Sequence, residues 1–302
     1  MEFNFKKKPG QKQEKACVTS IIEPKVSIVT PFYNSGKHFK ETYYCVINQT
    51  FDAFEWLIVN DGSTNEADVE ELLKLSEKDK RIHVFHQENG GQSKAKNRAI
   101  KESKTDIIIF LDADDLIEPF YVEYLYDALE KHPKAGWSYM DIVGFGAVEY
   151  VWCKRFSTGR MTFNNILVNS AAFRKKELEA VGYFSEVEKY YDEDWALYLK
   201  LLANKVHPVQ IPMIGFWYRK SENGMQQTVR KNKELREASD CYIEQLAKEI
   251  RIFITGETYK DTLPKKAVRS EYSKTDYVIA QICATKLGCY CIKKLYQMRK
   301  AR

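Results

Sequence analysis

The sequence predicts an α/β protein in which helices flank a mostly parallel central sheet, and three observations support this prediction. Short, almost wholly apolar runs alternate with helix-length amphipathic segments between residues 26 and 111. The runs lack the apolar–polar alternation of a sheet with one exposed face, as is typical of strands buried on both faces. Three runs end in clusters of Asp, Asn, Ser and Thr, the polar residues expected at the carboxyl ends of parallel strands.

The alternation is regular through the N-terminal half. Each apolar run has the length of a strand, and each segment between two runs is long enough for the crossover helix that parallel pairing requires. The expected strands are residues 26–30, 55–60, 82–86 and 106–111, and the expected helices are residues 37–48, 66–78 and 93–103.

The rhythm changes after Pro133. Strand material is expected at 137–148, a further strand or turn segment at 165–172, and two short strands at 206–211 and 214–219. Helices are expected at 174–181, where Gly182 ends the helix, at 193–204, and from Lys231 onward.

Composition divides the chain into three parts. Residues 1–24 are Lys- and Gln-rich without periodicity and are expected to form a flexible basic arm. Residues 25–225 are expected to form the main domain, and residues 226–302 a helical, basic C-terminal region. The net charge of +5 belongs to the two ends: residues 1–25 carry +3 and residues 289–302 carry +5, which leaves −3 for the rest. This distribution argues against a nucleic-acid-binding core.

Composition also excludes several classes of protein. No window reaches the roughly 20 apolar residues that cross a bilayer, which argues against a polytopic membrane protein. Charged residues follow Met1 without an apolar stretch, and the seven cysteines lack disulfide-scaffold spacing. We therefore expect a protein of the reducing cytoplasm.

An acidic loop follows the buried run at 107–111. Asp112, Asp114 and Asp115 stand within four positions, where their charges repel and partial burial is costly. A bound Mg²⁺ or Mn²⁺ removes both penalties and accepts phosphate oxygens as further ligands. For Asp115 the alternative is helix capping, because a helix is expected from Leu116 to Lys131.

The glycine-rich loops of common nucleotide sites are missing. The first strand runs into Pro31-Phe32-Tyr33-Asn34 rather than G-x-G-x-x-G, and no Walker-type loop occurs. The sequence therefore favours a nucleotide whose phosphates are held through a metal ion.

A second acidic cluster, Asp192-Glu193-Asp194-Trp195, opens the helix expected at 193–204. Acids in a first helical turn interact favourably with the helix dipole, which is a sufficient structural reason for one of them. A carboxylate among aromatic residues can also hold a pKa suited to proton abstraction.

Five segments in a fixed order carry a further signal. They are VSIVTPFYNSG (26–36), NQTFDAFEWLIVNDGST (48–64), ENGGQSKAKNRAI (88–100), IIIFLDADDLIEP (107–119) and YYDEDWALYLKLL (190–202). Each segment is weak evidence alone, but the ordered set covers about two-thirds of the chain. Together the five segments resemble a family-2 glycosyltransferase of the GT-A fold.

The resemblance implies a Rossmann-like GT-A sheet, a catalytic domain at 25–225 and inverting transfer from a sugar nucleotide. By position, it implies that Asp112 and Asp114 hold Mn²⁺ or Mg²⁺ on the donor diphosphate. It implies Asp194 as the base for the acceptor hydroxyl, with Glu193 and Trp195 on the acceptor side. The residues implied to bind the sugar nucleotide are Pro31, Tyr33, Asp61, Lys96, Asn97 and Asp112.

Three positions depart from the family pattern. Lys96 stands where the family has arginine, which keeps the charge but loses bidentate phosphate geometry. Ala99 replaces an expected glycine. No histidine follows Tyr218-Arg219, so a third protein ligand to the metal is not expected, and Lys220 is a candidate for neutralising the diphosphate directly.

The resemblance implies a nucleoside-diphosphate sugar as donor, with a UDP-sugar expected, and a saccharide or lipid-linked acceptor in bacterial surface polysaccharide or glycolipid synthesis. Two alternatives stay open. One is a non-catalytic carbohydrate-binding protein of the same fold. The other is a haloacid-dehalogenase-type phosphotransferase, although its D-x-D normally follows the first strand.

The C-terminal residues 284–302 combine apolar side chains with six cations. They are expected to form either an interfacial helix on anionic lipid or a basic helix packed on the catalytic domain. The first reading places the protein peripherally on the inner face of the membrane.

Overall fold

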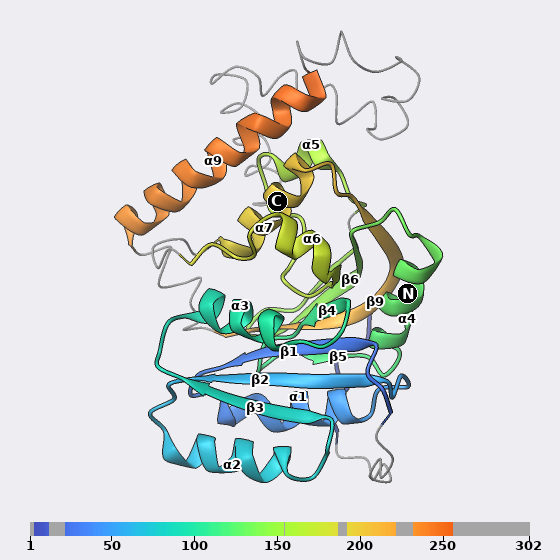
Figure 1. The fold of residues 1–302 in the computed structure, drawn as a ribbon, viewed down its shortest axis with the longest axis vertical. Helices are drawn as coiled ribbons and strands as arrows, with labels where there is room; N and C mark the ends of the chain where they lie inside the picture. Colours follow the sequence, from blue (N-terminus) through green and yellow to red (C-terminus); the bar gives the residue numbers. More distant parts are fainter. Residues whose placement is uncertain (1–2, 12–21, 154, 187–191, 222–231, 256–302) are drawn as a thin grey trace. The chain divides into compact units, whose positions relative to one another are not determined.

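The structure is a computed structural model that describes residues 3–11, 22–153, 155–186, 192–221 and 232–255 (Figure 1). The chain divides into two compact units. The first comprises Met1–Lys154, Asn169–Glu188 and His207–Thr228, and the second comprises Arg155–Val168, Lys189–Val206 and Val229–Arg302. The predicted boundary at 225/226 lies outside the described residues.

The first unit is built on one mixed sheet in the order β3-β2-β1-β4-β8-β6-β9-β5, with β7 paired to β6. Its first four strands are mutually parallel, as predicted from their continuous apolar runs. These strands are β1 (Val26–Phe32), β2 (Phe54–Asp61), β3 (Ile82–Gln87) and β4 (Ile107–Phe110).

Three helices connect these strands: α1 (Gly36–Ile47), α2 (Glu66–Ser76) and α3 (Gln92–Glu102). Figure 1 shows α3 on one side of the strands and α1 and α2 on the other. Strand order explains this placement, because the chain moves outward from β1 to β3 and then returns to β4. The two-sided cover matches the strands' burial: every residue of β2 and β4 is buried.

The other half of the sheet is mixed in direction. β8 (Ala172–Arg174) runs antiparallel to both β4 and β6 (Trp137–Gly146), whereas β9 (Pro208–Lys220) runs parallel to β6. Short strands complete it: β5 (Leu116–Ile117) pairs with β9, and β7 (Tyr150–Trp152) pairs with β6. Helices α4 (Tyr121–Lys131) and α6 (Lys175–Ala180) belong to the same unit.

One sequence prediction in this half is wrong. The two strands expected at 206–211 and 214–219 form the single strand β9. This strand continues past Pro212, which cannot donate to the ladder, because a shift of the register with β6 between Met140 and Asp141 leaves Pro212 out of the pairing. The segment 165–172, expected to be a strand or a turn segment, has no regular structure up to Ala171, and β8 begins at Ala172.

The second unit contains helices α5 (Thr158–Met161), α7 (Glu193–Ala203) and α9 (Lys233–Thr255). Helix α7 buries its predicted apolar residues Leu197, Leu201 and Leu202. Helix α9 begins where a C-terminal helical region was expected.

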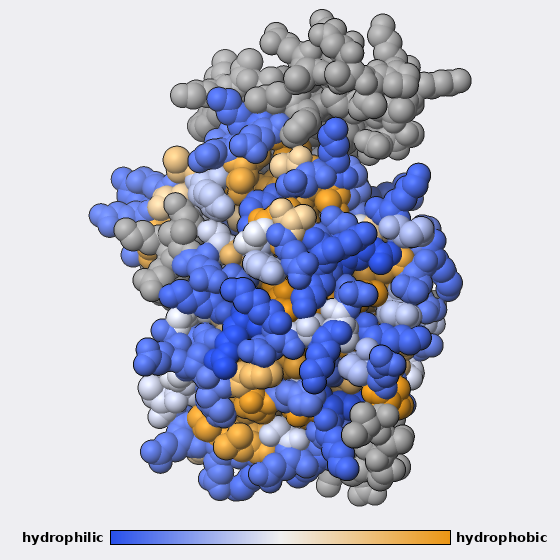
Figure 2. Space-filling view, viewed as in Figure 1, coloured by the Kyte–Doolittle hydropathy of each residue, from blue (hydrophilic) through white to orange (hydrophobic). Residues whose placement is uncertain are grey.

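Surface character agrees with composition. On the face drawn in Figure 2, apolar residues are interspersed among charged and polar ones. Among the residues that the structure describes, no helix combines the length and the apolar character needed to span a membrane.

Candidate functional site

The loops after the first two parallel strands are joined by Asn34. Its Oδ1 accepts hydrogen bonds from the backbone N–H groups of Thr64 (2.9 Å) and Asn65 (3.0 Å), and Asn34 itself has a positive φ of 47°. This arrangement leaves the neighbouring Tyr33, just after the carboxyl end of β1, 48% exposed. Pro31 lies within β1, opposite Val59 of β2.

Asp61, the last residue of β2, binds the loop that follows β3. One carboxylate oxygen accepts from Gln87 Nε2 (2.7 Å) and the backbone N–H of Gly90 (2.9 Å), and the other accepts from the N–H of Gly91 (2.9 Å). Asp61 is only 3% exposed. Gly62 follows with a φ of +70°, and a Cβ there would lie 2.7 Å from the backbone nitrogen of Asn89. The predicted donor-binding Asp61 therefore also fixes the turn before α3.

The N-terminal half of α3 faces the acidic loop. Gln92 Nε2 donates to Asp112 Oδ1 (3.0 Å), and Lys96 Nζ lies 3.3 Å from the same oxygen. The Lys96 side chain is fully buried, and its ammonium has no hydrogen-bond partner among the described residues. The Asp112 side chain is 30% exposed, so the buried Lys96 ammonium lies next to a carboxylate that solvent can reach.

Burial and charge repulsion raise two pKa values in the acidic loop. Burial, and then the charge of Asp112, raises the pKa of Asp114 to about 6. Burial, and then the charges of Asp114 and Asp112, raises the pKa of Asp115 well above its usual range. The loop thus holds more negative charge than its surroundings neutralise, which is the condition that a divalent cation relieves.

Asp115 does not cap a helix, so that alternative is wrong. Strand β5 intervenes, and α4 begins at Tyr121 with Phe120 at its N-cap position. The carboxylate of Asp115 instead accepts the backbone N–H of Arg219 on β9 (2.7 Å). Asp115 thus binds the C-terminal end of strand β9 rather than a helix terminus.

Metal-ligand types are sparse around this loop. No group of three or more His, Cys, Asp or Glu residues in the described part of the chain is placed to hold a metal ion. The accessible Asp112 with Asp114 still fits Mg²⁺ or Mn²⁺, because such ions commonly use one or two protein carboxylates and take their other ligands from water and substrate phosphates. The strongest fit is the buried Lys96 ammonium, which has no hydrogen-bond partner among the described residues and can donate to a phosphate oxygen.

Asn97 is engaged by protein groups. Its Nδ2 donates to the Phe184 carbonyl (3.0 Å) and to Glu186 Oε1 (2.8 Å), while its Oδ1 accepts from the Phe184 N–H (3.0 Å). The residue is 3% exposed. In this structure Asn97 anchors the segment after Gly182 to α3, a role that the sequence did not suggest.

The second acidic cluster belongs to the second unit. Asp194 Oδ1 accepts the N–H of Trp195 (2.7 Å), and Trp195 Nε1 donates to the Met161 carbonyl (2.7 Å). Asp192 Oδ2 accepts from Ser239 Oγ of α9 (2.6 Å). Helices α5 and α9 thereby fix the first turn of α7, where Glu193 and Asp194 are partly exposed.

Comparison with known proteins decides the family. The model of the family described as Glycosyl transferase family 2 matches residues 27–180. The chain belongs to this family. The sequence-based assignment to family 2 is confirmed.

Relatives of this family-2 chain include bacterial proteins. Glycosyltransferase GlyG of Streptococcus pneumoniae serotype 4 is 29% identical over 60% of this chain and 66% of its own length. An uncharacterised glycosyltransferase of Rickettsia bellii is 45% identical over 32% of this chain. The chain matches 14% of that relative's length, so it spans less than two-thirds of these relatives.

Solved structures confirm the GT-A α/β fold. S. aureus TarS 1–349 in complex with UDP-GlcNAc superposes with a TM-score of 0.62 at 20% identity, covering 86% of this chain and 81% of that one. Mannosyltransferase PcManGT from Pyrobaculum calidifontis, in complex with GDP-Man and Mn²⁺, gives 0.54 at 14% identity and covers 90% of each chain.

Sequence reasoning about this family-2 site missed three contributors. Gln92 supports Asp112, and its place opening α3 was the available signal. Arg219 was noted only as a landmark, although its N–H and guanidinium bind the acidic loop. Glu41, which accepts a hydrogen bond from Arg219, could not be found from the sequence, because it lies in an ordinary amphipathic helix.

Proposed function

We propose that this chain transfers a sugar from a nucleoside-diphosphate sugar to an acceptor hydroxyl, with inversion at the anomeric carbon. The observation that carries the proposal is the buried ammonium of Lys96, which lies 3.3 Å from the carboxylate of Asp112 but has no hydrogen-bond partner among the described residues. Asp112 follows β4 at the carboxyl ends of the parallel strands. A cation with free donors next to mutually repelling carboxylates suits a metal-bound diphosphate.

On the donor side, Asp112 and Asp114 hold Mn²⁺ or Mg²⁺, which supplies electrostatic stabilisation of the departing diphosphate. Lys96 donates to a diphosphate oxygen from the side of α3. The exposed Tyr33 ring and the Pro31 loop offer a surface for the nucleoside, and Asp61 has remaining acceptor capacity for the base or ribose. Lys220 is a weaker candidate for the diphosphate, because its ammonium lies 3.9 Å over the Tyr218 ring.

On the acceptor side, Asp194 removes the proton of the attacking hydroxyl, a contribution of roughly 10²–10⁴-fold for a placed general base. Glu193 and Trp195 contact the acceptor. A single displacement needs no second nucleophile, so the anomeric configuration inverts.

The donor is proposed to be a UDP-sugar, because the TarS structure with the higher TM-score carries UDP-GlcNAc. The relatives are bacterial glycosyltransferases, and the proposed role is surface polysaccharide or glycolipid synthesis, with a saccharide or lipid-linked acceptor. Peripheral membrane contact through 284–302 is part of this proposal. That segment lies outside the described residues, and deletion of it followed by membrane fractionation tests the contact.

The decisive experiment is a donor panel. Purified protein with Mn²⁺ is incubated with UDP-, GDP- and dTDP-sugars, and nucleotide release is measured with and without EDTA. We expect metal-dependent turnover of one nucleotide class and at least 100-fold less with Asp112→Asn. Binding of UDP–Mn²⁺ without turnover of any donor, with or without candidate acceptors, would instead support the non-catalytic carbohydrate-binding alternative.

A further inference from the structure

The N-terminal residues 3–11 are docked on the first unit. The Phe3 ring lies 5.4 Å from that of Trp217 on β9, centroid to centroid. Gly10 has a φ of +88°, and a Cβ there would lie 2.8 Å from the Glu41 carbonyl oxygen. Part of the segment expected to be a flexible arm thus follows a defined path along α1 and β9.

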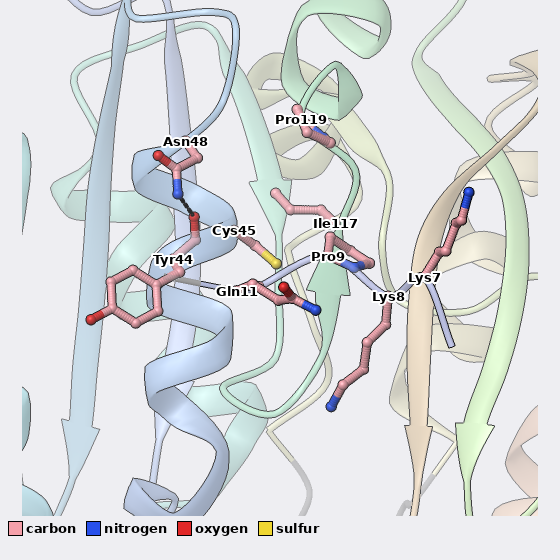
Figure 3. Close-up of a pocket in the computed structure, with 10 residues that line it drawn as sticks. Lys7, Lys8, Pro9, Gln11, Tyr44, Cys45, Asn48, Ile117 and Pro119 are labelled. Carbon is pink, nitrogen blue, oxygen red and sulfur yellow. Dashed lines mark hydrogen bonds between the residues drawn. The ribbon is translucent and has the colours of Figure 1, made fainter. Parts of the chain in front are cut away.

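Figure 3 shows this path from the side of α1, with Pro9 and Gln11 near Cys45 and Ile117. The segment and these elements together line a cavity of about 280 Å³. The Cys45 side chain is 3% exposed, and burial raises the pKa of its thiol to about 12. Cys45 therefore reports whether residues 3–11 are in place.

Lys8 connects this segment to Arg219 through Glu41. The ammonium of Lys8 donates to Glu41 Oε1 (2.5 Å), and Arg219 Nη2 donates to Glu41 Oε2 (2.5 Å). Burial works against ionisation of Glu41, but the hydrogen bonds from Lys8 and Arg219 outweigh it and hold its pKa below the usual range. One carboxylate is therefore shared between two cations on separate parts of the chain.

Arg219 carries the connection to the acidic loop. Its Nε donates to the Asp114 carbonyl (2.6 Å), and its backbone N–H donates to Asp115 Oδ1 (2.7 Å). Its guanidinium lies 4.5 Å from the centroid of the Phe145 ring. Because a guanidinium is planar, fixing Nη2 on Glu41 also fixes the direction of Nε toward Asp114.

We propose that Lys8 is a positioning residue for donor binding: by neutralising half of Glu41 it sets the geometry in which Arg219 holds the loop of Asp112 and Asp114. This inference deepens the proposed function and rests on it. The Lys8 and Glu41 side chains are 35% and 33% exposed, so their ion pair adds little to global stability. Its effect falls on the loop that Arg219 holds.

The test measures binding of UDP in the presence of Mn²⁺ by titration calorimetry on the full chain. Lys8→Met is expected to weaken the affinity about 2- to 5-fold, the range of a partly exposed ion pair. Lys8→Arg restores it. Arg219→Lys, which loses the planar fork, is expected to weaken it about 10-fold, as for residues that orient metal ligands. Lys6→Met is the matched control, because the exposed Lys6 carries the same charge two residues away.

A second variant separates docking from charge. Gly10→Ala is expected to lift the segment without unfolding the sheet, because the added Cβ meets the Glu41 carbonyl. N-ethylmaleimide labelling at pH 8, read by peptide mass spectrometry, should then modify Cys45 faster than in the wild type. UDP–Mn²⁺ affinity should fall at least as far as in Lys8→Met.

The outcomes are distinct. If the wild type binds UDP–Mn²⁺ and Lys8→Met binds equally well, the positioning role is overturned while the proposed function stands. The role is also overturned if Lys6→Met weakens binding as much as Lys8→Met, or if Gly10→Ala exposes Cys45 without loss of affinity. A wild type that binds no nucleotide with Mn²⁺ overturns the proposed function and this inference together.

Discussion

Two acids at the carboxyl ends of β2 and β4 are held in opposite ways. Asp61 is buried and accepts three hydrogen bonds, one from Gln87 at the end of β3 and two from Gly90 and Gly91 in the connection that follows. Asp112 is partly exposed, and its two contacts come from the side chains of Gln92 and Lys96. A carboxylate held by three local donors stabilises a turn, whereas one held loosely in a repelling cluster keeps the capacity to bind an external cation.

The largest effect is expected at Asp112. Asp112→Asn removes a charge that the metal-bound diphosphate needs, so we expect kcat to fall about 10²–10³-fold, as when one electrostatic stabiliser of a transition state is lost. The free energy of unfolding should change little, because the side chain is partly exposed. Steady-state kinetics and thermal unfolding of the same preparation measure both. A large loss of stability with normal kcat would show that Asp112 stabilises the fold and does not act on the donor diphosphate.

Asp61 should behave in the reverse manner. Asp61→Ala leaves the partly buried hydrogen bonds of the Gly90 and Gly91 N–H groups without their acceptor, and we expect unfolding to become easier by about 1–3 kcal/mol. Urea denaturation measures this loss. If stability is unchanged and only nucleotide affinity falls, Asp61 serves the donor alone and the contrast with Asp112 is wrong.

Asp114 gives a pH-dependent prediction of similar size. Its folded-state pKa of about 6 exceeds its usual value of 3.8, so the folded protein binds the extra proton between these values. Its contribution to stability is therefore complete below pH 4 and is lost as pH rises through 6.

In metal-free protein, Asp114→Asn should remove this decline and raise stability at pH 7 by about 1–3 kcal/mol, the equivalent of one to two pKa units. Denaturant unfolding at pH 4.5 and pH 7 in EDTA, compared between wild type and variant, measures the difference. A variant with the wild-type difference between the two pH values would show that Asp114 is not the titrating group.

The strand ends could be predicted from the sequence because they depend on local patterns. The apolar run at 107–111 followed by three aspartates is enough to place the acidic loop, and chain order is enough to place α3 beside it. Family resemblance then supplied roles that no residue pattern gives, above all that of Asp194.

The rest depends on contacts between distant positions. The bonds from Arg219 to Asp115 and Glu41 join residues 104 and 178 positions apart, and no periodicity encodes such pairs. The sequence likewise showed Asn97 as a polar residue on α3 but not the segment at Phe184 that it binds. The docking of residues 3–11 was missed because a Lys-rich segment without periodicity satisfies the ordinary criteria for a flexible arm.

The smallest effects come from a matched pair of glutamines. Gln87 donates to Asp61 and Gln92 donates to Asp112, so each serves one of the two acids. Each bond is worth about 1.5–3 kcal/mol at most, because the acceptor is charged, and less where water replaces it.

Gln87→Ala should therefore lower the unfolding free energy and leave UDP–Mn²⁺ affinity unchanged. Gln92→Ala should weaken that affinity about fivefold, equivalent to about 1 kcal/mol, with little change in stability. Calorimetry and denaturant unfolding on both variants form a two-by-two test. If both variants lose only stability, Asp112 is held as rigidly as Asp61. The metal affinity of the acidic loop would then depend on Lys96 and Arg219 rather than on a loosely held Asp112.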